Sequence, residues 1–197
     1  MNLNQPFKIK LEILSDKRGF LTELYSQKKI KFKFKHSIFS ASKKNVIRGF
    51  HFRIKPEIKI LYVLEGKIKD YCINLNRNGK KKIYKFNLRS KEGLFIPSGF
   101  AHGYECLEEK NNIIYFLSDN YKHHLQSGII WNDKKLNIKW KIKKPILSLR
   151  DKNLLSYEEV KLQSYLNWLD KIPVNHYKLL YLAHCKMKLQ NMMLPNF

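Results

Sequence analysis

The stretch Val46–Lys59, VIRGFHFRIKPEIK, combines a strand-forming pattern with side chains that carry chemistry. Its valine, isoleucine and phenylalanine residues favour strands, and Arg48 and His51 are polar residues set among them. Because side chains alternate between the two faces of a strand, Gly49, His51 and Arg53 are predicted to share one face. The glycine is expected to leave open space beside the imidazole of His51, which suits a small molecule that reaches a base.

Lys59 belongs to a second apolar run, KILYVLEG, which ends at the turn glycine Gly66. A histidine can take a proton, and a lysine can stabilise negative charge as it develops. Together, His51 and Lys59 favour one reaction class, which is proton abstraction next to a carbonyl. A structural alternative stays open, in which His51 is a core histidine and Lys59 extends its ammonium group from the surface into water.

Short strand-like segments follow one another along most of the chain, with turn residues at intervals of about eight to twelve positions. Beyond the opening stretch, strands are predicted over 7–14, 20–25, 34–40, 58–64, 67–75, 82–88, 94–96, 100–107 and 112–117. Turns are predicted at 15–19, 76–79, 92–93 and 97–99. This spacing indicates a mainly β fold, a sandwich or barrel of the jelly-roll type. No helix is predicted before about Ser156.

The C-terminal part follows a different pattern, with apolar residues at helical spacing. Residues 157–169 and 174–187 are each predicted to form a short amphipathic helix, and Pro173 suits the start of the second. The chain is therefore divided into a barrel domain, residues 1–152, and a helical C-terminal extension, residues 153–197. No chemistry is visible in the extension.

Composition sets the broad class of protein. A length of 197 residues fits one ordinary domain with a small appendage, and 44% hydrophobic residues are enough for a buried core. No apolar run is long enough to span a bilayer, and the N-terminus lacks the layout of a secretory signal. Cys72, Cys106 and Cys185 lack metal-type spacing, so free thiols in a reducing compartment are expected. The sequence predicts a cytoplasmic protein without a membrane partner.

The charge balance is strongly basic. The chain has 39 Lys and Arg residues against 16 Asp and Glu residues, which gives a net charge of +23. Such an excess raises nucleic acid as a partner. The lysines are spread over the whole length, however, and no helix-turn-helix, zinc-finger or RNA-recognition signature is present. A positive field equally favours a small phosphorylated substrate, and no nucleic acid partner is predicted.

Further stretches place charged, aromatic and small residues in an ordered series of motifs. They are D-x-R-G-F at Asp16–Phe20, IPSGFAHGY at Ile96–Tyr104, the tyrosines Tyr115 and Tyr121, IIWND at Ile129–Asp133 and ILSLRD at Ile146–Asp151. With VIRGFHF and Lys59, this series resembles the RmlC-type dTDP-4-dehydrorhamnose 3,5-epimerases of the cupin superfamily. The resemblance implies a cupin-type jelly-roll β-barrel, to which the short helical extension is added.

The resemblance also implies an enzyme that inverts C3, C5 or both in a nucleotide-linked 4-keto-hexose. His51 matches the general base that removes the proton beside the keto group, and Asp151 matches the carboxylate that hydrogen-bonds this histidine. Lys59 matches the cation near the keto oxygen, where enolate charge develops. His102 matches a second polar group of the pocket. Tyr115 matches the phenol that returns a proton on the opposite face, which inverts the carbon.

Four more residues match positions that hold the substrate in this family. Arg18, Glu23 and Arg48 match the nucleotide-diphosphate site, where a guanidinium offers phosphate a planar set of donors. Tyr121 matches a neighbour that shapes the pocket. The resemblance also implies a homodimer and a place in the synthesis of surface-polysaccharide sugars. No cofactor is implied, because the carbonyl of the substrate supplies the acidity.

The chain departs from the family at positions that contact the nucleotide. His36 and Ile38 stand in place of a Gln-x-Asn pair, and Gln126 stands in place of a glutamate. Which nucleotide and which sugar are bound therefore stays open, and so does the number of carbons inverted.

Two other functions stay open as alternatives. One is a cupin-type nucleotide-sugar 3,4-ketoisomerase, which usually carries a His-x-His pair where this chain has His51 followed by Phe52 and Arg53. The other is a non-catalytic cupin that binds a nucleotide sugar. Glu57 and His102 alone would be an incomplete ligand set, so no metal is expected.

Overall fold

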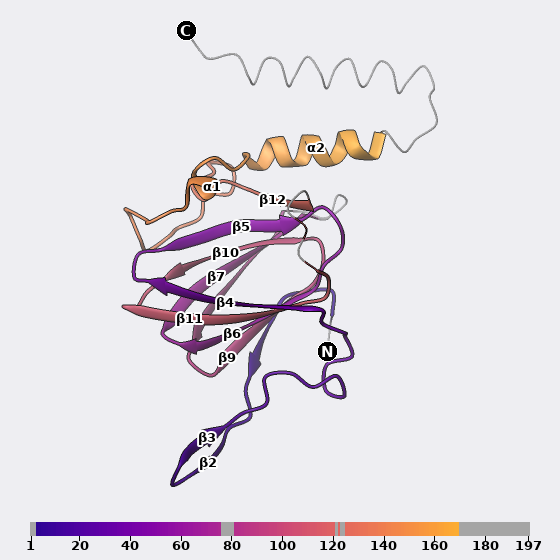
Figure 1. Cartoon of the computed structure of the whole chain (residues 1–197). Coiled ribbons are helices and arrows are strands. Elements are labelled where there is room, and N and C mark those ends of the chain that lie inside the picture. The colour runs from indigo at the N-terminus through magenta and orange to yellow at the C-terminus, as the bar shows by residue number, and fades with distance from the viewer. Residues whose placement is uncertain (1–2, 76–80, 121, 123–124, 170–197) are drawn as a thin grey trace.

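Two facing antiparallel sheets form the body of the protein (Figure 1). The computed structural model describes residues 3–75, 81–120, 122 and 125–169, and within these residues each of the two sheets has five strands. In spatial order, the first sheet contains β1 (Phe7–Lys10), β9 (Glu92–Ile96), β6 (Lys59–Glu65), β11 (Lys110–Leu117) and β4 (His36–Lys43). The second contains β12 (Gln126–Gly128), β5 (Ile47–Arg53), β10 (Phe100–Cys106), β7 (Lys67–Asn74) and β8 (Ile83–Arg89).

Three smaller elements accompany the sheets. A hairpin of β2 (Leu14–Asp16) and β3 (Gly19–Leu21) projects from the body (Figure 1). Helix α1 (Leu149–Lys152) is a single turn, and α2 (Tyr157–Leu169) follows it. The mainly β jelly-roll prediction and the predicted helix at 157–169 are thus confirmed. The second predicted helix, 174–187, lies outside the described residues.

The core is layered, because the central strands are buried on both faces. The inward-facing side chains of both sheets meet in one cluster, in which Leu61 and Val63 of the first sheet share the interior with Ile68 and Tyr104 of the second. Apolar residues from the N-terminal segment 7–34 cover the outer face of the first sheet. This arrangement explains why strands such as β6 and β10 read as continuous apolar runs instead of alternating ones.

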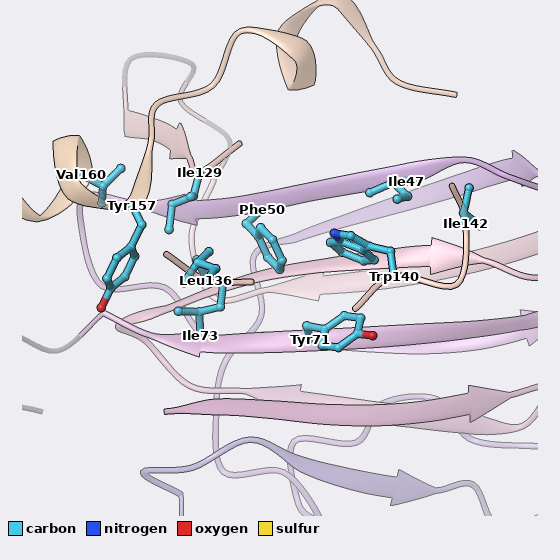
Figure 2. Close-up of a cluster of buried hydrophobic side chains, with 11 residues drawn as sticks. Ile47, Phe50, Tyr71, Ile73, Ile129, Leu136, Trp140, Ile142, Tyr157 and Val160 are labelled. Atoms are coloured by element: carbon cyan, nitrogen blue, oxygen red, sulfur yellow. The ribbon is translucent and has the colours of Figure 1, made fainter. Parts of the chain in front are cut away.

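The outer face of the second sheet is covered by the segment that leads to the C-terminal helices (Figure 2). The ring of Trp140 lies 5.4 Å from that of Phe50 and 4.9 Å from that of Tyr71, measured between centroids. Tyr157 and Val160, at the start of α2, belong to the same buried cluster. The first turn of α2 therefore packs against the barrel. The division of the chain into a barrel domain and an extension at residue 152 stays a prediction.

One predicted turn is wrong by two residues. Glu92 and Gly93 do not form the turn but begin β9, and the chain reverses at Ser90 and Lys91, where Lys91 has a φ of 70°. Glu92 instead closes the turn by accepting the backbone N–H of Arg89 at 3.0 Å. Gly93 is required by packing, since an added Cβ would lie 2.4 Å from the ring of Tyr62. This glycine marks a close contact and not a reversal of the chain.

Candidate active site

A cavity of about 230 Å³ opens between the two sheets. The first sheet contributes Ile38, Ser40, Lys59, Tyr115 and Leu117 to its lining, and the second contributes Arg48, His51, His102, Tyr104 and Gln126. Glu57, from the β5–β6 loop, and Arg150, from α1, complete it. Residues that are far apart in the sequence thus converge on one space.

Most of the predicted site residues gather at this cavity. Arg48, His51, Lys59, His102 and Tyr115 line it directly. Asp151 reaches it through a hydrogen bond to His51. The predicted catalytic set is therefore assembled in one place.

Two predicted substrate-binding residues lie elsewhere in this chain. Arg18 sits at the tip of the β2–β3 hairpin, where its guanidinium pairs with Asp16. Glu23 follows the hairpin and pairs with Lys29 at 3.1 Å. Neither lines the cavity. Tyr121 lies outside the described residues.

A bulge in β5 places Arg48 and His51 on the same side. His51 is opposite His102 and Arg48 is opposite Tyr104, so three steps along β5 face two steps along β10. The extra residue reverses the alternation of side chains between the two positions. Arg48 therefore joins His51 in the cavity, although simple alternation would separate them.

The predicted role of Gly49 is wrong. No open space lies beside it, because an added Cβ would meet the Cα of Gly103 at 2.5 Å. Its φ of 127° is also a value that side chains rarely allow. The two glycines let the backbones of β5 and β10 approach each other at the bulge. The space beside His51 comes from the gap between the sheets.

His51 and Asp151 form a hydrogen-bonded pair. His51 Nε2 lies 2.7 Å from Asp151 Oδ1, across 100 residues of sequence. Asp151 is buried in α1, whose N-cap Ser148 accepts the backbone N–H of Asp151 at 3.0 Å. Burial raises the pKa of Asp151, but the hydrogen bond and charge of His51 outweigh burial and hold the pKa below its usual value. The carboxylate of Asp151 accepts a hydrogen bond from Nε2 of His51. The other ring nitrogen, Nδ1, is therefore the one that can take a proton.

Lys59 lies in a buried group of charges. Glu57 Oε2 is 3.4 Å from Lys59 Nζ, and Glu57 Oε1 accepts a hydrogen bond from Arg53 Nη1 at 2.8 Å. Burial lowers the pKa of Lys59, and the negative charge of Glu57 opposes this effect. Glu57 is thus engaged by cations, and among the described residues no group of three His, Cys, Asp or Glu side chains could hold a metal ion.

Tyr115 and His102 line the cavity from opposite sheets, and each has a polar partner. The hydroxyl of Tyr115 donates to that of Tyr104 at 2.8 Å, and burial raises the pKa of Tyr115 well above 10. Tyr115 therefore carries its proton at neutral pH. His102 Nδ1 lies 3.3 Å from Asp70 Oδ2, and burial lowers the pKa of His102, which favours a neutral imidazole.

Several residues of the site are not predicted from the sequence as parts of it, among them Glu57, Asp70, Tyr104 and Arg150. Glu57 was considered only as a metal ligand, while Asp70, Tyr104 and Arg150 were given no role. Asp70 did leave a signal, since a carboxylate in the centre of the apolar strand 67–75 must find a partner. Tyr104 carries no such signal, because a tyrosine ring also fills a core.

His51 and Tyr115 line the cavity from opposite sheets. His51 projects from β5 of the second sheet, and Tyr115 projects from β11 of the first. A molecule between them can lose a proton on one side and gain one on the other. The fold and this site define a cupin-type barrel with a histidine and a tyrosine on opposite sides of its interior cavity.

Comparison with known proteins agrees with that class. Residues 1–159 match the family of dTDP-4-dehydrorhamnose 3,5-epimerases. The chain belongs to this family. The family relationship predicted from the ordered motifs is thus confirmed.

Individual relatives share the fold over most of their length. The dTDP-4-dehydrorhamnose 3,5-epimerase of Shigella flexneri is 30% identical over 154 residues, which cover 72% of this chain and 85% of that protein. A Bacillus anthracis enzyme of the same name, solved with TDP and PPi bound, matches with a TM-score of 0.74 and 30% identity over 79% of this chain and 96% of its own. A Legionella pneumophila RmlC, solved with dTDP-4-keto-L-rhamnose, has a TM-score of 0.74 and 26% identity over 81% of this chain and 94% of its own.

Among the residues that the structure describes, none of the helices combines the length and the apolar character needed to cross a bilayer.

Proposed function

We propose that this protein is a dTDP-4-dehydrorhamnose 3,5-epimerase, which inverts the carbons on both sides of the keto group of a nucleotide-linked 4-keto-hexose. The observation that carries the proposal is the His51–Asp151 pair facing Tyr115 across one cavity. The relatives with this name, and the nucleotide-sugar ligand in the Legionella structure, support the same substrate class.

The reaction begins with the removal of a proton next to the keto group. Nδ1 of His51 takes the proton from C3 or C5, and the electron pair of the broken C–H bond moves into an enolate. Asp151 stabilises the imidazolium that forms. Lys59 stabilises the negative charge on the enolate oxygen, because its buried ammonium group lines the same cavity, and His102 is a second polar group of that cavity.

The second half returns a proton to the opposite face of the same carbon. Tyr115 is protonated and stands on the facing sheet, so its O–H delivers a proton where His51 cannot reach. The keto group is restored, and the carbon is inverted. The protein needs no electron carrier for this sequence, since the substrate and product have the same oxidation state.

Two cations suit the diphosphate of the substrate. Arg48 is oriented by a hydrogen bond from its Nε to Ser42 Oγ at 3.0 Å, and Arg150 lines the cavity beside the catalytic Asp151. Guanidinium groups bind phosphate through paired donors. Ile38 and Gln126 also line the cavity. They stand at positions where the family carries other residues, so they belong to the part of the site that selects the nucleotide and sugar.

Arg18 and Glu23 are still proposed to bind the substrate. We place this contact in a homodimer, at the cavity of the partner protomer. Both belong to the arm, residues 14–29, whose β2–β3 hairpin projects away from the barrel (Figure 1). Strand β4 is the outer strand of the first sheet and exposes Phe39 at 60%. An exposed apolar edge strand favours pairing with a second copy. In such a dimer, the arm of one protomer supplies its two residues to the cavity of its partner.

We also propose a cytoplasmic location. Cys72 and Cys106 are buried, free thiols. Burial raises the pKa of Cys106 to about 11, which makes it an inert core residue. Unpaired cysteines are typical of reducing compartments.

The test is deuterium exchange at the sugar carbons, followed by NMR in heavy water. The wild-type protein is given nucleotide-linked 4-keto sugars, beginning with the dTDP-linked 4-keto-6-deoxy-glucose series. Deuterium is expected at C3 and C5 together with inversion, and His51→Ala is expected to abolish both. Binding without exchange would contradict the proposal and indicate a binding module. Migration of the keto group to C3 would indicate a ketoisomerase instead.

A further inference from the structure

One hydroxyl in the cavity is not explained by packing. Tyr104 on β10 is only 1% exposed, and its ring belongs to the apolar cluster between the sheets. Phenylalanine would fill the same space. The hydroxyl nevertheless lies 2.8 Å from that of Tyr115, which comes from the opposite sheet. The polar atom of Tyr104 is therefore directed at the proton donor of the proposed reaction.

We propose that Tyr104 is a positioning residue for Tyr115, which aims the Tyr115 hydroxyl at the reacting carbon and stabilises it after the proton has left. This inference rests on the proposed epimerase function, since it assigns a role within that reaction. Tyr104 acts through Tyr115 and does not itself touch the reacting atoms.

The proposed proton transfer requires that the hydrogen-bond partner of Tyr115 can both accept and donate a hydrogen bond. In the free enzyme, Tyr115 donates its hydrogen to the oxygen of Tyr104. When the substrate enolate is present, the Tyr115 hydrogen turns from Tyr104 towards the carbon, the O–H bond breaks as the proton moves to the carbon, and a tyrosinate remains. A hydroxyl can then turn and donate to that tyrosinate, because it carries one hydrogen and two lone pairs. Before the next inversion, the imidazolium of His51 releases its proton to solvent and solvent returns a proton to Tyr115.

The surroundings of the pair fit this role. Burial raises the pKa of Tyr104 to about 12 and that of Tyr115 well above 10, so both are neutral and share one hydrogen bond. While it accepts the hydrogen of Tyr115, Tyr104 raises the pKa of Tyr115, and so does Asp70, whereas the positive charge of Arg48 lowers the pKa of both hydroxyls. Tyr104 therefore stabilises a tyrosinate only after its own hydroxyl has turned to donate. Tyr104 is almost fully buried, so a tyrosinate at Tyr115 that loses the Tyr104 hydroxyl as a donor is destabilised, because little water can take the place of that hydroxyl.

The experiment separates proton removal from proton delivery. Tyr104→Phe, Tyr115→Phe and the wild type are compared in heavy water, with deuterium incorporation and inversion measured at each carbon by NMR. His51 can exchange a proton on its own face without Tyr115. We therefore expect Tyr104→Phe to slow inversion by about tenfold, with exchange largely retained, so that the ratio of exchange to inversion rises. Tyr115→Phe should show the same change to a greater degree.

A matched control is Tyr71→Phe. Tyr71 is also a buried tyrosine, and its hydroxyl donates one hydrogen bond to the carbonyl of Lys139 at 3.0 Å, but it lies in the outer cluster of the second sheet. Its variant should leave the ratio of exchange to inversion unchanged. If Tyr104→Phe slows exchange and inversion equally, or changes neither, the assignment is wrong. If the wild-type protein itself neither exchanges nor inverts, the proposed function fails instead.

Discussion

The ammonium group of Lys59 shows at the residue scale how buried charges set the chemistry of the cavity. Its neighbours are Glu57 and Arg53, with Cys72, Asp70 and His102 as the further titratable groups that interact with it. Only a protonated Lys59 stabilises an enolate. Because burial lowers its pKa, this form is lost at a lower pH than for an exposed lysine.

Replacing Glu57 with glutamine should narrow the pH range of activity. Glu57 opposes the effect of burial, so its removal lowers the pKa of Lys59 further. The decline of kcat/KM on the alkaline side is expected to begin at a lower pH, while the acidic side is unchanged. Arg53 keeps Asp119 as a partner at 3.2 Å, and circular dichroism verifies that the variant folds. Glu65→Gln, an exposed change, serves as the control. An unshifted alkaline limb would argue against a charged Lys59 in the reaction.

The sequence motifs were sufficient to predict which residues meet at the cavity, but not those that hold them in place. His51, Lys59, His102, Tyr115 and Asp151 all meet at one site, as predicted. Their partners depend on contacts between strands that are distant in sequence. The pairing of Tyr104 with Tyr115 requires two sheets to face each other, and a single sequence does not indicate which inward-facing side chains meet.

At the scale of the elements, the β5–β10 pair depends on two glycines. Gly49 has a φ of 127° and no room for a Cβ, since that atom would meet Gly103 Cα at 2.5 Å and the carbonyl oxygen of His102 at 2.8 Å. Gly19, in the hairpin, has a similar φ of 130° but nothing within 4 Å of the same position. Alanine substitutions at Gly49 and Gly19 therefore distinguish the free-energy cost of the backbone conformation from the free-energy cost of the steric clash.

Gly49→Ala should therefore destabilise the protein far more than Gly19→Ala. We expect a loss of about 1 kcal/mol in the free energy of unfolding for Gly19→Ala, and about 2–4 kcal/mol for Gly49→Ala, where overpacking is added. Urea unfolding of both variants provides the measurement. Equal losses would mean that the strands separate without cost at the bulge.

Strands were predicted well where burial alone decides the pattern of apolar and polar residues. They were predicted poorly where packing against a neighbouring side chain requires a glycine. The alternating strand 82–88 and the apolar run of β6 were recognised within one residue at each end. Gly93 was taken as a turn because the sequence does not reveal the ring of Tyr62 above it. The single turn of α1 was missed, since four residues are too short for helical periodicity.

At the scale of the whole molecule, the arm determines how many chains one site needs. Arg18 lies on the projecting hairpin, away from the cavity that contains His51. If the proposed dimer exchanges arms, every site combines His51 of one protomer with Arg18 of its partner. Light scattering should then give twice the chain mass of 23.7 kDa.

Mixing two inactive variants tests that exchange directly. His51→Ala and Arg18→Ala are each expected to have little activity. After they are unfolded together and refolded, a mixed dimer contains one site with both residues intact, so about a quarter of all sites should recover activity. Refolding each variant alone is the control. Activity in the mixture that stays at the level of the separate variants would show that Arg18 does not serve a partner's site.

The hydrogen bond between His51 and Asp151 also has a consequence for the order in which the protein is made. Synthesis from the N-terminus completes the strands of both sheets before residue 151 leaves the ribosome. A nascent chain that has already emerged as far as Tyr115 contains the proposed acid and the proposed base, but it lacks the carboxylate that pairs with His51. In the proposed mechanism, catalytic competence is thus acquired only after residue 151 has emerged, when the segment that covers the second sheet brings Asp151 into place.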